Sequence, residues 1–297
     1  MSLVFSELLL HANTQSQLET FLEQPGSALL LSGRPGSGKK AVARGLAAVL
    51  LDTDIDKLSN HPHLILVNKP EDKSEISIDS IRQVISKLNL RVAGGRDRVI
   101  NRVVIIENAQ FMSREAQNAL LKLLEEPPAN TLLILTTNSE DNLLPTVVSR
   151  TQKVSIIAPS LNQSLKYFDK YSAAEVESSW RLSQGGAGLL SALLVDEADH
   201  PLKLAVEDCK DFIRKDSYHR LIKLQQISKD KAGLAVFLEA LAKVLAALHS
   251  ANINKGHSKE AQKLLESRKA VEASILQLEH NTNTRLISLA LALNIRL

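Results

Sequence analysis

The chain contains one cysteine, Cys209, among its 297 residues. A single cysteine excludes an internal disulfide framework and any zinc site built from several cysteines of this chain. Chains without disulfides are typical of reducing compartments. We therefore expect the protein to be cytoplasmic.

The sequence also has little net charge and no long uninterrupted apolar run. Its formal net charge is +3 at pH 7, which is too small to argue for nucleic-acid binding by itself. No such run approaches the ~18 residues of a membrane-spanning helix. The first seven residues lack the basic region with which a signal peptide begins. The sequence therefore predicts a globular protein with no membrane partner.

The first half of the chain alternates short β-branched runs with amphipathic stretches, which is typical of an α/β domain with a parallel sheet. This pattern fills residues 1–157. The expected strands cover residues 28–32, 64–67, 103–106, 131–137 and 154–157. A helix is expected over residues 39–51, and another is expected to begin at a Ser113 cap and end before Pro127-Pro128.

Strand patterns disappear after Pro159. Residues 158–199 predict a small helical domain, and His200-Pro201 marks a boundary. Residues 200–297 are helical in pattern, and their last helix carries Leu286, Leu289 and Leu293. Because only 3% of the chain is aromatic, we expect these helices to pack through leucine and alanine, as a bundle without a ligand pocket.

A phosphate-binding loop is indicated at residues 33–40, Gly-Arg-Pro-Gly-Ser-Gly-Lys-Lys. In such loops the backbone N–H groups bind phosphates, a lysine approaches the β- and γ-phosphates, and a final Ser or Thr ligates Mg²⁺. The candidate nucleotide-binding residues here are Gly33, Gly36, Ser37, Gly38, Lys39 and Lys40. Lys40 stands where the hydroxyl belongs, and an ammonium group cannot ligate a cation.

A second position of the candidate site also departs from the usual chemistry. A hydrolysing domain of this class ends a buried strand with two acids, one for Mg²⁺ and one for the attacking water. This chain has Glu107-Asn108 after the expected strand at 103–106. Glu107 has the length to approach a metal, but Asn108 is a poor base. The two losses predict nucleotide binding without hydrolysis, or no binding.

A third set of motifs resembles the clamp-loader branch of the AAA+ proteins. It comprises Asn118-Ala119-Leu120-Leu121-Lys122-Leu123-Leu124-Glu125-Glu126-Pro127-Pro128, Thr136-Thr137 at a strand end, and Ser149-Arg150 before the last strand. Residues 27–157 carry the resemblance, which within the branch is strongest to the delta prime family of bacterial DNA polymerase III. That family is known for degenerate nucleotide motifs.

The resemblance implies a fold, partners and a site. It implies a RecA-like AAA+ domain (1–157), a helical lid (158–199) and a helical collar that oligomerises (200–297). The partners would be gamma/tau-type and delta-type clamp-loader subunits, and indirectly the sliding clamp and primer–template DNA. Thr137 joins the degenerate nucleotide site. No cofactor or metal would be required, although ATP or ADP could bind without hydrolysis.

Arg150 is the one candidate catalytic residue. In the family this arginine points toward the γ-phosphate held by a neighbouring subunit, where a cation stabilises transition-state charge. The chain would then be a non-catalytic scaffold that supplies Arg150 to its neighbour, within a DNA-directed DNA polymerase holoenzyme. An ordinary ion-paired surface arginine is the competing interpretation.

Two other functions stay open. The first is an active gamma/tau-type ATPase, against which Lys40, Asn108 and the absence of cysteines from residues 51–58, where the family has a zinc module, all argue. The second is a nucleotide-independent adaptor outside replication. The first predicts hydrolysis by the isolated chain, and the second predicts no ring and no effect of Arg150.

Overall fold

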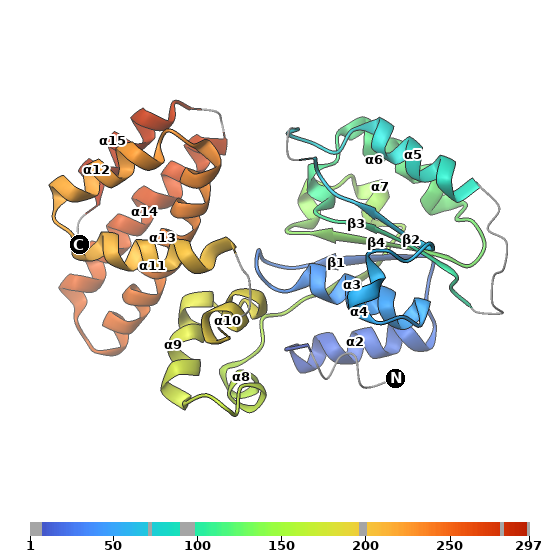
Figure 1. Cartoon of the computed structure of the whole chain (residues 1–297), viewed down its shortest axis with the longest axis horizontal. Coiled ribbons are helices and arrows are strands. Elements are labelled where there is room, and N and C mark those ends of the chain that lie inside the picture. The colour runs from blue at the N-terminus through green and yellow to red at the C-terminus, as the bar shows by residue number, and fades with distance from the viewer. Residues whose placement is uncertain (1–7, 71–72, 90–98, 196–200, 280–281, 296–297) are drawn as a thin grey trace. The chain divides into compact units, whose positions relative to one another are not determined.

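The computed structural model describes residues 8–70, 73–89, 99–195, 201–279 and 282–295. The chain divides into two compact units, Met1–Tyr167 and Phe168–Leu297 (Figure 1). The first unit includes helix α8 (Leu161–Tyr167), which lies beyond the predicted limit at residue 157. The division into three domains at residues 157 and 199 stays a prediction.

The first unit is built on a five-stranded parallel sheet. Its strands are β1 (Ala28–Ser32), β2 (Leu64–Val67), β3 (Arg102–Ile106), β4 (Thr131–Thr137) and β5 (Gln152–Ser155). They lie in the order β2-β3-β4-β1-β5, and Leu29 stands opposite both Ile134 and Gln152. Nearly continuous apolar runs suit the inner strands, because helices cover both faces of such a sheet.

The last strand begins two residues earlier than the sequence predicts. Residues 154–157 are the more apolar stretch, but β5 pairs with β1 through Gln152–Ser155. β5 is an edge strand, and Val154 is its one buried residue. An edge strand with one covered position carries little apolar signal, so the apolar Ile156-Ile157 pair beyond its end was mistaken for part of it.

Helices connect the strands and form a layer on each face of the sheet. They are α2 (Ala12–Glu23), α3 (Lys39–Leu51), α4 (Ile55–Leu58), α5 (Ile78–Asn89), α6 (Arg114–Glu125) and α7 (Pro145–Val148), with short 3-10 helices η1 (Ala109–Phe111) and η2 (Glu140–Asn142). As predicted, α3 covers residues 39–51, and the Ser113 hydroxyl caps α6 by accepting from the Ala116 N–H.

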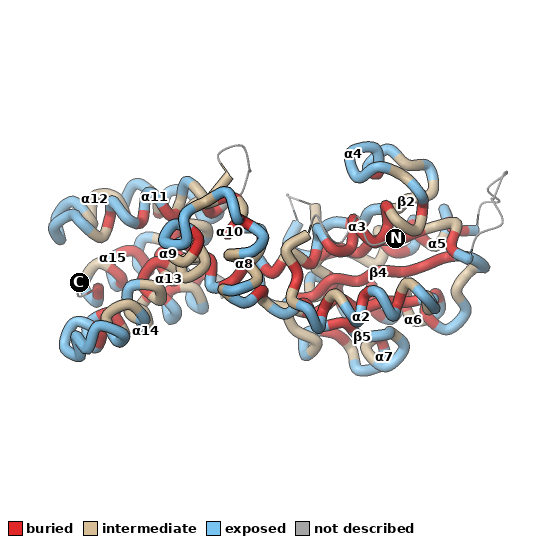
Figure 2. The backbone as a smooth tube through the Cα atoms, turned by 90° about the horizontal axis from the view of Figure 1, so that it is seen from below, coloured by how far each residue is buried: buried red, intermediate tan, exposed pale blue. Residues whose placement is uncertain are grey.

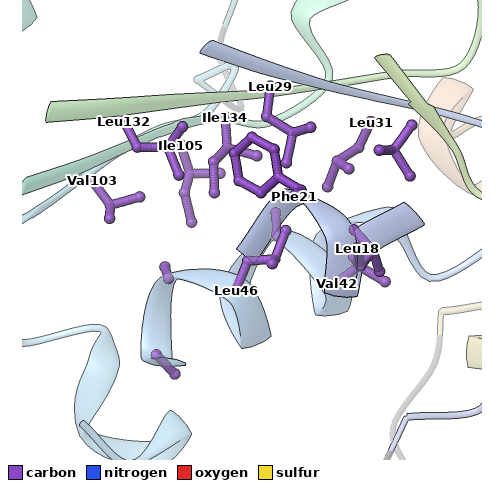
Figure 3. Packing of buried hydrophobic residues seen from close by; sticks show 14 of the residues in the cluster. Leu18, Phe21, Leu29, Leu31, Val42, Leu46, Val103, Ile105, Leu132 and Ile134 are labelled. Carbon is purple, nitrogen blue, oxygen red and sulfur yellow. The ribbon is translucent and has the colours of Figure 1, made fainter. Parts of the chain in front are cut away.

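Alternation along the strands separates two apolar cores. Leu29 and Leu31 face α2 and α3, where Phe21 and Leu46 are buried (Figure 3). Leu30 faces the opposite core, which α5, α6 and α7 complete. Successive strand residues point to opposite faces, so one short run such as β1 contributes to both cores. β4 is buried along its whole length (Figure 2).

The second unit is entirely helical over its described residues. Its helices are α9 (Ala173–Ser183), α10 (Ala187–Leu194), α11 (Pro201–Arg214), α12 (Ser217–Ile227), α13 (Lys231–Asn254), α14 (Ser258–Glu279) and α15 (Thr284–Asn294). α13 supplies much of the shared core through Leu234, Leu238, Leu241 and Leu245, and Cys209 of α11 is buried in the same cluster.

Helix α13 is the one apolar helix among the described residues that is long enough to span a membrane. It is 24 residues long with a mean hydropathy of 1.7 over 18 residues, so by length and composition it could cross a membrane. Glu239 and Lys243 interrupt its apolar run, which is why inspection of uninterrupted runs missed it. Its buried side chains form the centre of the second unit's core, as expected of a core helix, and such a helix passes the same test.

The leucines of α15 also differ from expectation. Leu286, Leu289 and Leu293 are 61%, 42% and 82% exposed, whereas Ile287 and Leu291 are buried. These three leucines, here called the leucine stripe, follow one side of the helix because helical residues three, four and seven apart share a face. The bundle therefore packs through the other face of α15 and leaves the stripe uncovered.

We expect Leu241→Ala to lower the free energy of unfolding by about 2–5 kcal/mol, because Leu241 is fully buried and its truncation leaves a cavity. Leu293→Ala, in the same unit, should change it by less than about 0.5 kcal/mol. Urea denaturation followed by circular dichroism measures both. Equal effects of the two variants would contradict the burial described for α13 and α15.

Candidate nucleotide-binding site

The candidate phosphate-binding loop lies where the sequence places it, between the end of β1 and the start of α3. Gly36 and Gly38 have φ angles of 76° and 92°, which residues with a Cβ rarely adopt. Gly33 is needed for a different reason, since a Cβ there would lie 2.7 Å from the Ile156 carbonyl oxygen. The three glycines therefore allow the backbone path that a phosphate-binding loop requires.

Lys39 turns back into its own loop. Its Nζ donates to the carbonyl oxygens of Gly33 at 2.6 Å and Arg34 at 2.8 Å, and lies 3.5 Å from the Ser37 hydroxyl. Burial, and secondly the charge of Lys40, lowers the pKa of Lys39 to about 8. A phosphate chain in the loop would have to compete with these carbonyls for the ammonium group.

Glu107 is surrounded by cations. Its carboxylate is almost fully buried, with Lys40 Nζ 2.9 Å from Oε2 and Arg44 Nη2 2.9 Å from Oε1. Arg44 Nε also donates to Oε1 at 3.1 Å. With its amide assigned by hydrogen bonding, Asn68 donates to Oε2 at 3.1 Å. Both carboxylate oxygens are therefore engaged by donors from this chain. Lys40, Arg44, Asn68 and Glu107 are called the Glu107 cluster below.

The cluster changes the expected chemistry of Glu107. The sequence predicts that the Glu107 side chain is long enough to approach a metal ion. In the structure, the Lys40 and Arg44 charges take the position next to the carboxylate that Mg²⁺ would need. The residues therefore fit a phosphate chain at the loop amides and do not fit Mg²⁺ at Glu107. Among the described residues, no group of three or more histidine, cysteine or acidic side chains could hold a metal ion.

The analysis of the sequence missed Arg44 and Asn68. Arg44 follows Lys40 by four residues on α3, and residues at this spacing share one face of a helix. That spacing was a usable signal for a second cation beside Glu107. Asn68 follows the end of β2, and because β2 pairs with β3, its approach to Glu107 depends on the strand order.

Asn108 and Thr137 lie at the carboxyl ends of β3 and β4. Asn108 has a left-handed φ of 56°, and its backbone N–H donates to the Thr136 hydroxyl at 2.9 Å. The Thr137 hydroxyl donates to the Ser139 carbonyl at 2.6 Å, and the Thr137 carbonyl accepts from the Gly33 N–H. Since β1, β3 and β4 are neighbouring parallel strands, the predicted nucleotide-site residues gather at their carboxyl ends. The roles assigned to them stay predictions.

Arg150 lies at the amino ends of the strands, opposite the ends that carry the phosphate loop. It precedes β5, whereas the phosphate loop follows β1, and β5 runs parallel to β1. The two ends of β1 are about 17 Å apart, which exceeds the reach of an arginine side chain. Arg150 is 37% exposed, with Nη2 2.7 Å from Glu125 Oε1 and Nη1 donating to the Thr146 carbonyl. It therefore cannot serve its own loop.

Comparisons with known proteins agree with this architecture. Residues 11–160 match the model of the family described as DNA polymerase III, delta subunit. The chain is 31% identical over 159 residues to subunit delta′ of Pseudomonas aeruginosa, covering 48% of this chain and 47% of that protein. It is 29% identical over 185 residues to subunit delta′ of Escherichia coli, covering 56% and 54%. The matches thus span about half the length of these relatives.

A solved structure supports the fold over nearly the whole chain. It is a DNA polymerase III gamma subunit-related protein of Thermotoga maritima, with a TM-score of 0.58 and 17% identity, covering 96% of this chain and 100% of that one. At this identity the likeness concerns the fold alone. The predicted fold, an α/β domain with a parallel sheet followed by helical regions, is confirmed.

The Glu107 cluster predicts an asymmetry in stability. Glu107→Gln should lower the free energy of unfolding by about 1–2 kcal/mol, because Lys40 and Arg44 are half-exposed and can turn to water. The double variant Lys40→Met/Arg44→Met should cost about 3–5 kcal/mol, because it leaves a buried carboxylate without a cation. Urea denaturation compares the two.

The triple variant Glu107→Gln/Lys40→Met/Arg44→Met is the control for this comparison. It removes the buried charge together with its partners, so it should be more stable than the Lys40→Met/Arg44→Met variant. If removing the two cations costs no more than removing the acid, the cations do not neutralise Glu107.

Lys39 predicts a pH dependence of stability. Its pKa is about 8 in the folded chain and 10.5 in the unfolded chain, so the unfolded chain binds more protons between these values. Its contribution is fully present above the unfolded pKa and is lost as pH falls through 8. From pH 7 to 10, the free energy of unfolding of the wild type should rise by about 1–3 kcal/mol relative to Lys39→Met.

Lys122→Met, at an exposed site on α6, controls for loss of a lysine. A difference that stays flat with pH would contradict the burial of Lys39.

Proposed function

Since the chain belongs to the DNA polymerase III, delta subunit, family, we propose that it is the non-catalytic, delta-prime-like subunit of a bacterial sliding-clamp loader. In this role it is part of a ring with gamma/tau-type and delta-type subunits. The ring loads the clamp on primer–template DNA during replication, as part of the DNA polymerase III holoenzyme in the cytoplasm.

The observation that carries the non-catalytic part of the proposal is the Glu107 cluster. Hydrolysis of this kind uses one acid to hold Mg²⁺ and a second group to position the attacking water. Here Lys40 Nζ lies 2.9 Å from the Glu107 carboxylate, and the adjacent position is Asn108. Neither task has a suitable group, so the chain's own site does not turn over ATP.

Arg150 supplies the active contribution. Arg150 lies at the amino ends of the strands, away from its own loop, and so is directed to another molecule. Its ion pair with Glu125 holds the exposed guanidinium in place. When a neighbour's ATP approaches, the γ-phosphate takes over from Glu125 as the anionic partner. A guanidinium delivered in trans stabilises the charge that develops on the transferred phosphoryl group.

Nucleotide is not required by the chain's own site. ATP or ADP can bind through the loop amides of residues 33–38 and through Lys39, once Lys39 leaves the Gly33 and Arg34 carbonyls. Because Lys40 and Arg44 already neutralise Glu107, such binding takes place without a metal ion. The bound nucleotide would then be a structural ligand.

The helical second unit provides the contacts that hold the ring together. The leucine stripe of α15 is a row of exposed apolar side chains on a helix whose other face is buried. Exposed apolar patches of this kind mark sites of protein association. We assign the stripe to contact with the helical collar of an adjoining subunit.

The decisive test is ATP turnover by the reconstituted loader, stimulated by clamp and primed DNA. Arg150→Ala should lower kcat by tenfold or more while the ring stays assembled, because the neighbour's site loses a transition-state cation. Arg82→Ala is the matched control, since Arg82 is also an exposed, ion-paired arginine of this unit. Glu125→Ala removes only the ionic partner of Arg150 within the chain and should leave most of the turnover.

Three results would contradict parts of the proposal. Unchanged turnover by an intact Arg150→Ala ring removes the role in trans and leaves a scaffold. Hydrolysis by the isolated chain, abolished by Lys39→Ala, indicates a gamma/tau-type ATPase instead. Failure of the wild type to assemble with loader subunits, judged by size-exclusion chromatography, indicates an adaptor outside replication.

A further inference from the structure

The second unit contains a groove that the sequence did not predict. Its volume is about 320 Å³, and it lies between α9, α11 and α13. It is lined by ten residues: Ser178, Arg181, Leu182, Lys210, Ile213, Arg214, Val244, Ala247, Leu248 and Ala251. The small number of aromatic residues led us to expect a bundle without a pocket. The small side chains Ala247 and Ala251 instead leave space between the helices.

The floor of the groove is an apolar strip along α13. Val244, Leu248 and Ala251 are spaced four and three residues apart, so they share one face of the helix. The strip extends over about 10 Å, or two helical turns. Leu248 is an exposed large hydrophobic residue. A strip of this length can receive apolar side chains from successive turns of another helix.

The rim of the groove is positively charged. Arg181 is paired with Glu177 on its own helix. Lys210 and Arg214 form no ion pair with any residue that the structure describes, and the lining contains no acidic residue. The two cations are four residues apart on α11, where like charges destabilise a helix by about 0.2–0.5 kcal/mol. An anionic partner would relieve this repulsion.

Two of the three acids on α11 are paired with other lysines. Asp208 accepts from Lys223 at 3.2 Å, and Asp211 pairs with Lys215 at 2.7 Å. The hydrogen bond from Lys215 is the main reason why the pKa of Asp211 is lowered, and Arg214 contributes least among the nearby cations. The third acid of α11, Glu207, precedes Lys210 by three residues, lies outside the groove lining and forms no ion pair with either cation.

We propose that this groove binds an acidic amphipathic helix of a partner protein. Its apolar side chains lie on the strip of α13, and its flanking carboxylates pair with Lys210 and Arg214. An apolar floor bordered by cations is complementary to an apolar stripe bordered by acids. The inference goes beyond the proposed function, because the groove shares no residue with the phosphate loop, Arg150 or the leucine stripe.

The test is fluorescence anisotropy with the full chain and two labelled 18-residue helical peptides. Both carry leucines at i, i+4 and i+7. The acidic probe has glutamate at the flanking positions, and the basic probe has lysine there. We expect saturable binding of the acidic probe and at least tenfold weaker binding of the basic probe.

Two variants and a matched control locate the binding. Lys210→Glu/Arg214→Glu should weaken binding of the acidic probe at least tenfold, and so should Ala247→Phe, which fills the groove without changing its charge. Lys259→Glu/Lys263→Glu changes two lysines of α14, outside the groove lining and at the same spacing, and should leave binding unchanged. Circular dichroism confirms that each variant is folded.

Several outcomes would overturn the proposal. They are no saturable binding of the acidic probe, equal binding of the two probes, or equal losses in the groove and control variants. Self-association of the wild-type chain that Ala247→Phe abolishes, measured by sedimentation, would assign the groove to a second copy of this chain instead.

Discussion

The ionic contacts of Glu107 are the interaction on which the chemistry of the first unit depends. A buried carboxylate is costly unless it is paired, and a nucleotide-hydrolysing site meets this need with Mg²⁺. Here Lys40 and Arg44 of α3 meet it from within the chain. The pairing joins α3 to the end of β3, and Asn68 joins the end of β2 to the same carboxylate. The loop keeps its glycine geometry, while the position beside Glu107 is already filled by positive charge.

The two ends of the parallel strands carry different functional groups. The carboxyl ends of the strands hold the phosphate loop, Glu107, Asn108 and Thr137, and the Glu107 carboxylate, the Lys39 ammonium group and the Thr137 hydroxyl are engaged within the chain. The amino ends of the strands present Arg150, which follows α7 and pairs with Glu125 at the end of α6. The proposed function uses both ends, because a domain without turnover at its own loop can still offer a cation from the opposite ends of the strands.

The helical unit uses its apolar residues in two ways. One face of α13 is buried in the shared core, whereas the leucine stripe and the groove beside α13 leave apolar surface uncovered. Rows of exposed apolar side chains are unfavourable in water, and burying such a row against a partner lowers the free energy. The stripe is apolar and the groove has a cationic rim, so the two surfaces suit partners of different chemistry.

The sequence by itself determined the elements of the first unit and the defects of its site. The apolar runs gave the five strands, because buried parallel strands need continuous apolar residues, and only the edge strand β5 was misplaced. Lys40 and Asn108 were visible as departures from a spaced motif. Tertiary structure alone decided what the departures do, because only the strand order brings Asn68 and α3 to Glu107. It also decided which face of α15 is buried, since a helix rich in leucine on several sides does not specify by periodicity which side packs inward.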